Sequence, residues 1–190
     1  MEEGRYTRVK SRFWGDEKVR LWDNDMKFLA LYLLTSPHGN ILGCFVLHKL
    51  YICADLNWTP QQLEAPFNRL IAEGFIRYDE TTNLILITKF LHHNPVTNPN
   101  QVKACIKQLN ELPKSLLLKD LKDLVEGLGK GLGKDLYKDL VEALGYAVSV
   151  SVTVSAPVTV TEEKPPAPKG ARRRLKNYTP EFEEFWSAYP

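Results

Sequence analysis

The stretch 59-TPQQLEAPFNRLIAEGFIRYD-79 decides the fold, because a capped helix within it runs directly into an extended segment. Thr59 is a good N-cap residue, and Pro60 suits the first helical position. Gln62 stands three residues after Thr59, which completes a capping box. Gly74 is a typical C-cap residue. These signals predict a helix that begins at Pro60, ends at Gly74 and leads at once into a strand.

The predicted helix has two unlike faces. Its apolar residues recur at helical spacing, so one face is expected to be buried. Pro66 lacks the amide that would bond the carbonyl of Gln62, and we expect a kink or a local loosening there. The apolar face consists of Leu63, Phe67, Leu70 and Ile71, and the face left towards solvent carries Gln61, Gln62, Asn68 and Arg69.

The neighbouring segments supply the rest of the predicted domain. Residues 75–90, FIRYDETTNLILITKF, read as two strands around the turn DETTN, which predicts a β-hairpin. Upstream, residues 24–34 place Met26, Leu29, Ala30, Leu33 and Leu34 on one helical face, and residues 47–57 predict a shorter helix. The order of helix, short helix, capped helix and hairpin predicts a winged helix-turn-helix domain, which belongs to the α+β class and is mainly α. Winged helices also serve as protein-interaction modules, so the fold alone does not assign a function.

The chain divides into three predicted zones. Residues 1–112 have varied composition and form the winged-helix domain. Residues 113–177 are predicted to be a low-complexity helical tract followed by a flexible linker, in which KDLVEGLG at 122–129 returns as KDLVEALG at 138–145. Residues 178–190 are predicted to begin a truncated C-terminal domain.

The middle zone contains opposing signals. Leucines spaced by three or four residues from Leu117 to Leu144 predict an amphipathic helix, whereas glycines at 127, 129, 131 and 133 weaken its middle. We therefore expect two short helical pieces around a flexible joint. In residues 146–176, valine alternates with serine or threonine as in a strand, but the Pro-rich and basic sequel favours a linker.

Two further segments have helix signals. Residues 98–112 begin with an Asn98 cap and are expected to pack back on the domain, with a dimer helix as the alternative. Thr179-Pro180 begins a predicted helix with an aromatic face, and the basic run 172–176 before it suits nucleic acid, an acidic partner or a solvated linker end. The aromatic face consists of Phe182, Phe185, Trp186 and Tyr189.

Composition limits the classes of protein. The formal net charge is +2, and residues 1–112 hold 13 Lys/Arg against 12 Asp/Glu, so nucleic-acid binding there needs local patches. No apolar run is long enough to span a bilayer and no secretory signal is present, so we expect a cytoplasmic protein without membrane contact. The cysteines are three in number and lack paired spacing, which predicts reduced, mostly buried thiols.

The candidate DNA-binding residues fall into three groups. Gln61, Gln62, Asn68 and Arg69 on the third helix suit base edges, since amides pair with adenine and Arg with guanine, although a solvated face is the alternative. Arg77 and Lys89 on the hairpin suit phosphates. Arg5, Arg8, Lys10 and Arg12 form a basic N-terminal arm that suits a backbone clamp, with a surface charge run as the alternative.

Aromatic and histidine side chains often occur in binding or metal sites, but here we expect them to have structural positions. Phe13, Trp14 and Trp22 are expected to be core or lid residues that pack on the first helix, with base stacking as the less favoured role. His92 and His93 have no Cys, Asp or Glu at ligand spacing, so we interpret them as a loop pair and not as a metal site. The sequence contains no phosphate loop and no nucleophile with a base, so we expect no cofactor and no enzymatic activity.

Four stretches resemble a known family: GRYTRVKSRFWGDEKV (4–19), LYLLTSPHGNILGCF (31–45), AEGFIRYD (72–79) and NPNQVKACIKQL (98–109). Together they look like the N-terminal winged-helix domain of phage and prophage replication initiation proteins, related in layout to primosomal helicase loaders. Residues 178–190, YTPEFEEFWSAYP, look like the opening of a C-terminal domain in such proteins. That domain normally continues past this point, so we expect it to be truncated or lost.

The resemblance implies a DNA-binding replication initiation protein that binds an origin through residues 1–112 and recruits replication machinery through its tail. The implied partners are double-stranded DNA and the replicative helicase or its loader, and a homo-oligomer stays open. A winged-helix transcriptional regulator and a winged helix used only for protein interaction are the alternatives.

Overall fold

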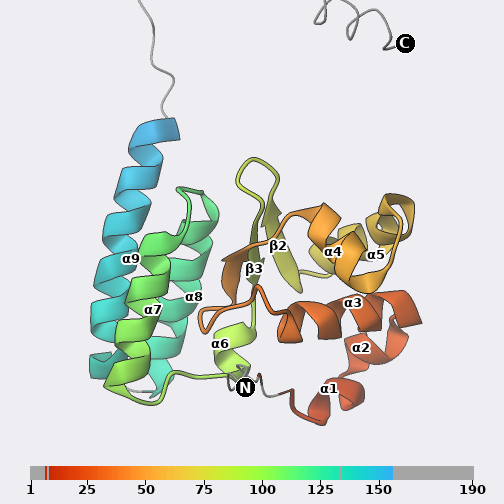
Figure 1. Ribbon diagram of the computed structural model, residues 1–190. Coiled ribbons are helices and arrows are strands. Elements are labelled where there is room, and N and C mark those ends of the chain that lie inside the picture. Colours follow the sequence, from red (N-terminus) through yellow and green to blue (C-terminus); the bar gives the residue numbers. More distant parts are fainter. Residues whose placement is uncertain (1–6, 8, 133, 156–190) are drawn as a thin grey trace, which may run out of the picture. The chain divides into compact units, whose positions relative to one another are not determined.

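Helices make up most of the chain, and a small antiparallel sheet of three strands lies among them (Figure 1). The computed structural model describes residue 7, residues 9–132 and residues 134–155, which belong to the unit Met1–Pro157. The predicted α+β, mainly α class is confirmed. In chain order the elements are α1 (Arg12–Gly15), α2 (Glu17–Leu21), α3 (Asn24–Thr35), β1 (Cys44–Val46), α4 (Lys49–Leu56), α5 (Pro60–Ala72), β2 (Ile76–Asp79), β3 (Leu84–Ile87), α6 (Phe90–His93), α7 (Pro99–Glu111), α8 (Leu117–Leu132) and α9 (Lys134–Ser155).

Strand β3 is the centre of the sheet, whose order is β1-β3-β2. Cys44 pairs with Leu86 on one side and Ile76 pairs with Ile87 on the other. All four side chains of β3 are buried, because helices cover both faces of the sheet. The predicted hairpin is confirmed as β2 and β3. Strand β1 was not predicted, because three residues are too few to show an alternating pattern.

Gly43 precedes β1 and approaches the first residue of α6 very closely. Its φ is +67°, and a Cβ atom placed there would lie 2.4 Å from both Cβ and Cγ of Phe90. The carbonyl of Gly43 accepts a 2.8 Å hydrogen bond from the amide of Ile87. Glycine therefore meets two demands at this position, a left-handed backbone and contact with an aromatic side chain.

Helix α5 begins and ends as the sequence predicts. The Thr59 hydroxyl accepts a 3.3 Å hydrogen bond from the amide of Gln62, whose side-chain oxygen accepts one of 2.8 Å from the amide of Thr59. At the other end, Gly74 has a φ of +70° and donates to the carbonyl of Ile71, while the amide of Phe75 donates to the carbonyl of Leu70. This pair of bonds is a Schellman motif. The helix runs without interruption through Pro66, which is buried.

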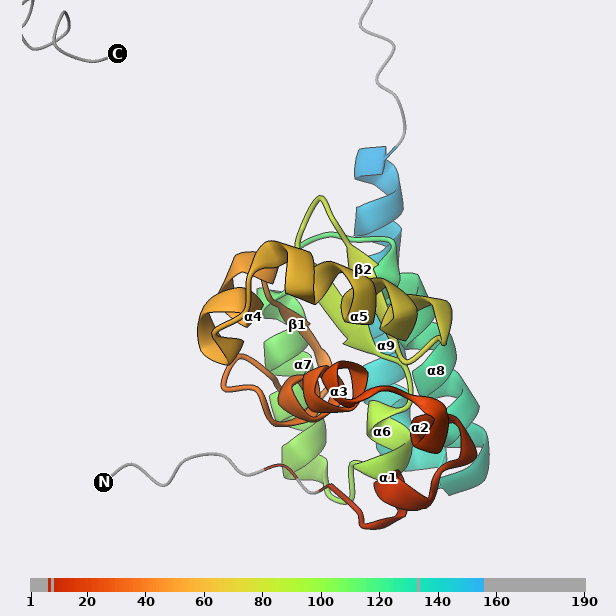
Figure 2. The same ribbon diagram turned by 90° about the vertical axis from the view of Figure 1, so that its right-hand side faces the viewer.

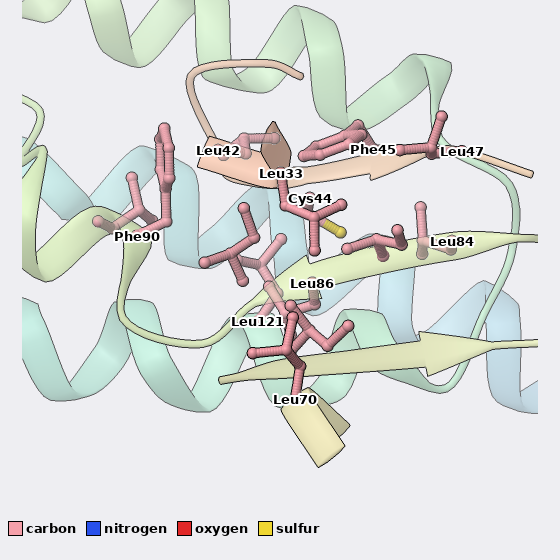
Figure 3. Packing of buried hydrophobic residues seen from close by; sticks show 14 of the residues in the cluster. Leu33, Leu42, Cys44, Phe45, Leu47, Leu70, Leu84, Leu86, Phe90 and Leu121 are labelled. Carbon is pink, nitrogen blue, oxygen red and sulfur yellow. The ribbon is translucent and has the colours of Figure 1, made fainter. Parts of the chain in front are cut away.

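The sheet separates two groups of helices (Figures 1 and 2). Helices α3, α4 and α5 pack on one another on one side of it, and α7, α8 and α9 lie on the other, where α8 touches β2 and β3. Leu70 of α5 and Leu121 of α8 converge on the core around Leu86 (Figure 3). The two groups of helices therefore share one hydrophobic core, with β3 in its middle.

Several packing predictions are confirmed, whereas Trp14 and Ile71 are more exposed than predicted. On α3, Met26, Leu29, Ala30 and Leu33 are buried as predicted, and Leu34 is partly buried. Trp22 is buried edge-on to Phe75, with ring centroids 5.5 Å apart, as expected of a core residue. Trp14 is 57% exposed, because α1 is a single turn without a buried residue.

The tract after residue 112 corrects the sequence analysis. The leucine spacing does give helices, α8 and α9, but they are long and contribute Leu118, Val125 and Leu144 to the core shared with the sheet. The interpretation of residues 146–155 as linker is wrong, and so is the strand alternative, because α9 continues to Ser155. Burial of one face of α9 outweighs the β propensity of alternating valine.

Two hydrogen bonds tie this tract to the rest of the unit. Tyr137 of α9 is buried, and its hydroxyl accepts a 3.2 Å bond from the amide of Val96, in the segment before α7. Ser115, just before α8, is also buried and donates a 2.5 Å bond to a carboxylate oxygen of Asp79 at the end of β2. The predicted boundary at residue 112 thus falls inside one packed unit. The predicted linker from 156 and the helix from Thr179 lie outside the described residues.

Candidate nucleic-acid interface

The polar face of α5 is exposed, as the sequence predicts. Gln61, Asn68 and Arg69 all lie at the surface, because the apolar stripe of the helix faces the core. Gln62 is exposed too, but its side-chain oxygen is held in the capping box. Ile71 is 38% exposed, so the buried stripe narrows towards the end of the helix. Gln61 and Asn68 therefore offer the least committed hydrogen-bonding groups on this face.

A pocket of about 410 Å³ lies beside α5, from Pro60 to Asn68. Helix α4 forms one wall, α5 forms another, and Glu80 in the hairpin turn borders it. Gln61 and Asn68 both line this pocket, together with the carboxylate side chain of Glu64. The structure thus brings two of the predicted residues together, but it places them next to acidic groups.

Lys49 at the start of α4 contacts both the hairpin turn and α5. Its ammonium lies 2.5 Å from a carboxylate oxygen of Glu80 and about 5 Å from the ring centroids of both Phe67 and Tyr78. The two rings themselves meet edge to face, 5.1 Å apart. This cation therefore serves packing and an ion pair, and its charge is largely compensated.

The other cations near α5 are also paired with acids. Arg69 forms an ion pair with Asp23, the N-cap residue of α3. Lys18 of α2 lies 3.6 Å from Glu73 at the end of α5. These pairs cancel most of the positive charge around the predicted recognition face, which lowers its attraction for phosphates.

Arg77 points its guanidinium at α8 and not into open solvent. Its Nη1 lies 2.6 Å from a carboxylate oxygen of Asp120, and the side chain remains about half exposed. Arg77 of the hairpin is therefore paired with α8, which belongs to the tract 113–177 that was predicted to be separate from the winged-helix domain. Lys89, the second predicted hairpin contact, lies past the end of β3, where it is the exposed N-cap residue of α6.

The basic N-terminal arm is described only in part. Arg5 and Arg8 lie outside the described residues, whereas Lys10 and Arg12 are exposed beside α1. Both act electrostatically on His93, as does Lys89, so all three cations lie within electrostatic range of this histidine. No local pattern in the sequence indicates this relation between the arm and α6.

His92 and His93 are the residues that sequence reasoning missed. They are the last two residues of α6 and not a loop pair, and their ring centroids lie 5.1 Å apart. The pKa of His93 is lowered, first by burial and then by the positive charges of His92, Lys10, Lys89 and Arg12. The only sequence signal was that Lys89 stands within one helical turn of both histidines.

The chemistry available at these surfaces is hydrogen bonding and charge attraction. Among the described residues no group of three or more His, Cys, Asp or Glu side chains gathers as metal ligands would. Burial raises the pKa of Cys44 to about 12 and that of Cys105 to about 11, so neither thiol is a nucleophile at neutral pH. All three cysteines are free and buried, as predicted.

Comparisons with protein families, with curated proteins and with solved structures found no match to this chain. Within the described part, no helix is both long and apolar enough to cross a bilayer.

Proposed function

We propose that this protein binds double-stranded DNA through a winged helix-turn-helix built from α3 to β3. The observation that carries the proposal is the order α3, β1, α4, α5, β2 and β3, in which an amphipathic helix with an exposed amide face is followed at once by an antiparallel hairpin. In domains of this type the third helix enters the major groove. We assign this role to α5.

The role proposed for each side chain depends on which of its hydrogen-bonding groups are not already engaged within the protein. Gln61 and Asn68 read base edges from the pocket side of α5, since side-chain amides suit the donor and acceptor pair of adenine. Gln62 contributes its amide nitrogen only, and Arg69 has to leave Asp23 before it can pair with a base. Lys89, Lys10 and Arg12 contact phosphates, which position the protein without specifying sequence.

The biological setting that we propose is initiation of replication in a phage or prophage, with recruitment of a replicative helicase or its loader. Support for it comes from the sequence resemblance over residues 4–112. A winged-helix transcriptional regulator is the alternative with the same interface. Footprinting at an origin and at promoters separates the two.

A protein-interaction module is the second candidate, and a specific observation favours it. The cations around α5 are paired with acids, through Lys18 with Glu73, Lys49 with Glu80 and Arg69 with Asp23. A face compensated in this way attracts a polyanion less than a typical recognition helix does. The exposed apolar side chains of Leu50 and Tyr51 on α4 suit a protein partner.

Selection of bound duplexes from a random pool by the full chain tests the proposal. We expect an enriched sequence, which is lost or relaxed at one or two positions in the Asn68→Ala variant. Asn110→Ala removes the same amide from the exposed surface of α7 and is the matched control, expected to select the wild-type sequence. Failure of the wild-type chain to retain any duplex at low salt contradicts the proposal and leaves the protein-interaction module.

A further inference from the structure

Five cationic or proton-accepting side chains gather where the N-terminal arm meets α6. Figure 2 shows α1 below α6, and in Figure 1 α1 lies below α6 and to its right. The rings of His92 and His93 lie 5.1 Å apart, Lys89 stands in the same helical turn, and Lys10 and Arg12 lie within electrostatic range of His93. All five residues are exposed. We call this set the basic corner: Lys10, Arg12, Lys89, His92 and His93.

Charges of one sign gather at the basic corner. Among the described residues, the charged groups named as acting on His93 come from the arm, from the start of α6 and from its neighbour, and all of them are positive. Within the described part of the chain, no ion pair joins any of the five residues to an acid. A cluster of like charges without a counterion is destabilised by mutual repulsion, and a bound anion relieves that repulsion.

The basic corner lies at the C-terminal end of α5. The hydroxyl of Thr88 donates a 2.7 Å hydrogen bond to the carbonyl of Gly74, which fixes Lys89 next to the exit of that helix. The pocket with Gln61 and Asn68 extends along α5 from its first residue to Asn68, about one turn before the helix ends. The pocket and the basic corner thus lie along the same helix.

We propose that the basic corner is the main phosphate-binding site for the backbone of duplex DNA. The inference rests on the proposed DNA-binding function and moves the principal backbone contact away from the hairpin, where Arg77 is held by Asp120. It also adds His92 and His93 to the interface. Cations that neutralise phosphates release counterions, so this site dominates the salt dependence of binding.

His93 makes this contact sensitive to pH. Burial and the surrounding cations favour the neutral form of His93 in the free protein, and a phosphate beside it favours the protonated form. Binding therefore takes up protons. Affinity is expected to rise as the pH falls from about 8 to about 6, the range in which histidine titrates.

The test measures fluorescence anisotropy of a labelled random-sequence duplex with the full chain, over a salt series at pH 6 and at pH 8. The triple variant Lys10→Ala, Arg12→Ala, Lys89→Ala should flatten the slope of log affinity against log salt by about 2 to 3, since each lost phosphate contact removes about 0.9. The variant Lys103→Ala, Lys107→Ala, Lys119→Ala removes the same charge from exposed positions on α7 and α8. This control should change the slope by less than about 1.

A second arm tests the histidines. The wild-type chain should bind about tenfold more tightly at pH 6 than at pH 8, and the His92→Gln, His93→Gln variant should lose most of that difference. His38→Gln, which removes an exposed histidine beside Asp55, should keep it. These side chains are exposed, and thermal melts confirm that each variant is folded.

The outcomes separate this inference from the proposed function. If the wild-type chain binds duplex but the triple variant keeps its slope, or the control loses as much, the basic corner is not the site and DNA binding still stands. If the histidine variant keeps the full pH response, the histidines do not belong to the interface. If the wild-type chain binds no duplex at low salt at either pH, both proposals are wrong.

Discussion

The guanidinium of Arg77 lies 2.6 Å from the carboxylate of Asp120, which joins strand β2 to helix α8. The sequence predicted that Arg77 on the hairpin would face DNA phosphates, but in the structure its guanidinium is paired with α8. One face of β2 and β3 is covered by α8, so the hairpin is part of the core between two groups of helices. A hairpin held in this way offers less surface for a nucleic-acid backbone than a free wing does.

Arg77→Ala is therefore expected to leave duplex affinity within about twofold of wild type, because the charge it removes is already paired with Asp120. The ion pair is exposed, and its loss should cost less than about 1 kcal/mol of unfolding free energy. Anisotropy titration and urea unfolding check both values. Lys89→Ala, which removes an unpaired cation, serves as the comparison and should weaken binding more.

Tyr137→Phe should destabilise the protein by about 1–3 kcal/mol, because the buried amide of Val96 loses its hydrogen-bond acceptor. Urea denaturation followed by far-UV circular dichroism gives the difference. Tyr146→Phe removes the same hydroxyl from a side chain that is 75% exposed and should change stability by less than about 0.5 kcal/mol. Equal effects of the two substitutions would show that α9 does not dock on the segment before α7.

The bond from Ser115 to Asp79 predicts a dependence of stability on pH. The pKa of Asp79 is lowered, chiefly by the Ser115 hydroxyl, so the folded state favours the ionised carboxylate. This stabilisation is present above the unfolded pKa of about 3.9 and is lost as the pH falls through the lower folded value. Ser115→Ala should be less stable than wild type at about pH 6, and the difference should shrink towards about pH 3.

Urea unfolding at several pH values measures that difference. Ser11→Ala is the control, because Ser11 is exposed and its side chain makes no cap hydrogen bond. A gap between Ser115→Ala and wild type that stays constant from neutral to acid pH would contradict the role given to Asp79.

Gly43→Ala should destabilise the protein far more than Gly74→Ala, although both glycines have positive φ. A left-handed backbone costs an alanine about 1–2 kcal/mol, and this cost applies at both positions. Only at Gly43 does the new methyl group overlap Phe90, which adds about 1–3 kcal/mol, whereas nothing lies within 4 Å at Gly74. Thermal melts of the two variants give the order directly, and equal losses would contradict the close packing of α6 on β1.

The helix and hairpin signals of residues 59–90 could be predicted, because they are local. Thr59, Gln62 and Gly74 act on backbone groups within a few residues, so their spacing in the sequence contains the whole signal. The packing of α8 and α9 could not be predicted in the same way. It depends on distant contacts such as Tyr137 with Val96 and Ser115 with Asp79, which no periodicity reveals.

The candidate interface also contains features that local sequence predicts and features that depend on distant contacts. The exposure of Gln61 and Asn68 follows from the period of one helix, so the sequence was sufficient. The ion pair of Arg69 with Asp23 and the electrostatic effect of Lys10 on His93 join segments that are far apart in the chain. Which cations remain free for a phosphate is therefore a property of the tertiary fold.

The most direct test of the account is a titration of the isotope-labelled full chain with duplex DNA, followed by backbone and imidazole NMR shifts. We predict that the largest changes fall on Lys89, His92 and His93 and on the exposed side of α5 at Gln61 and Asn68. Val46 and Tyr51 on the exposed apolar surface should change little. Shifts confined to that apolar surface, or no shifts at low salt, would contradict the account.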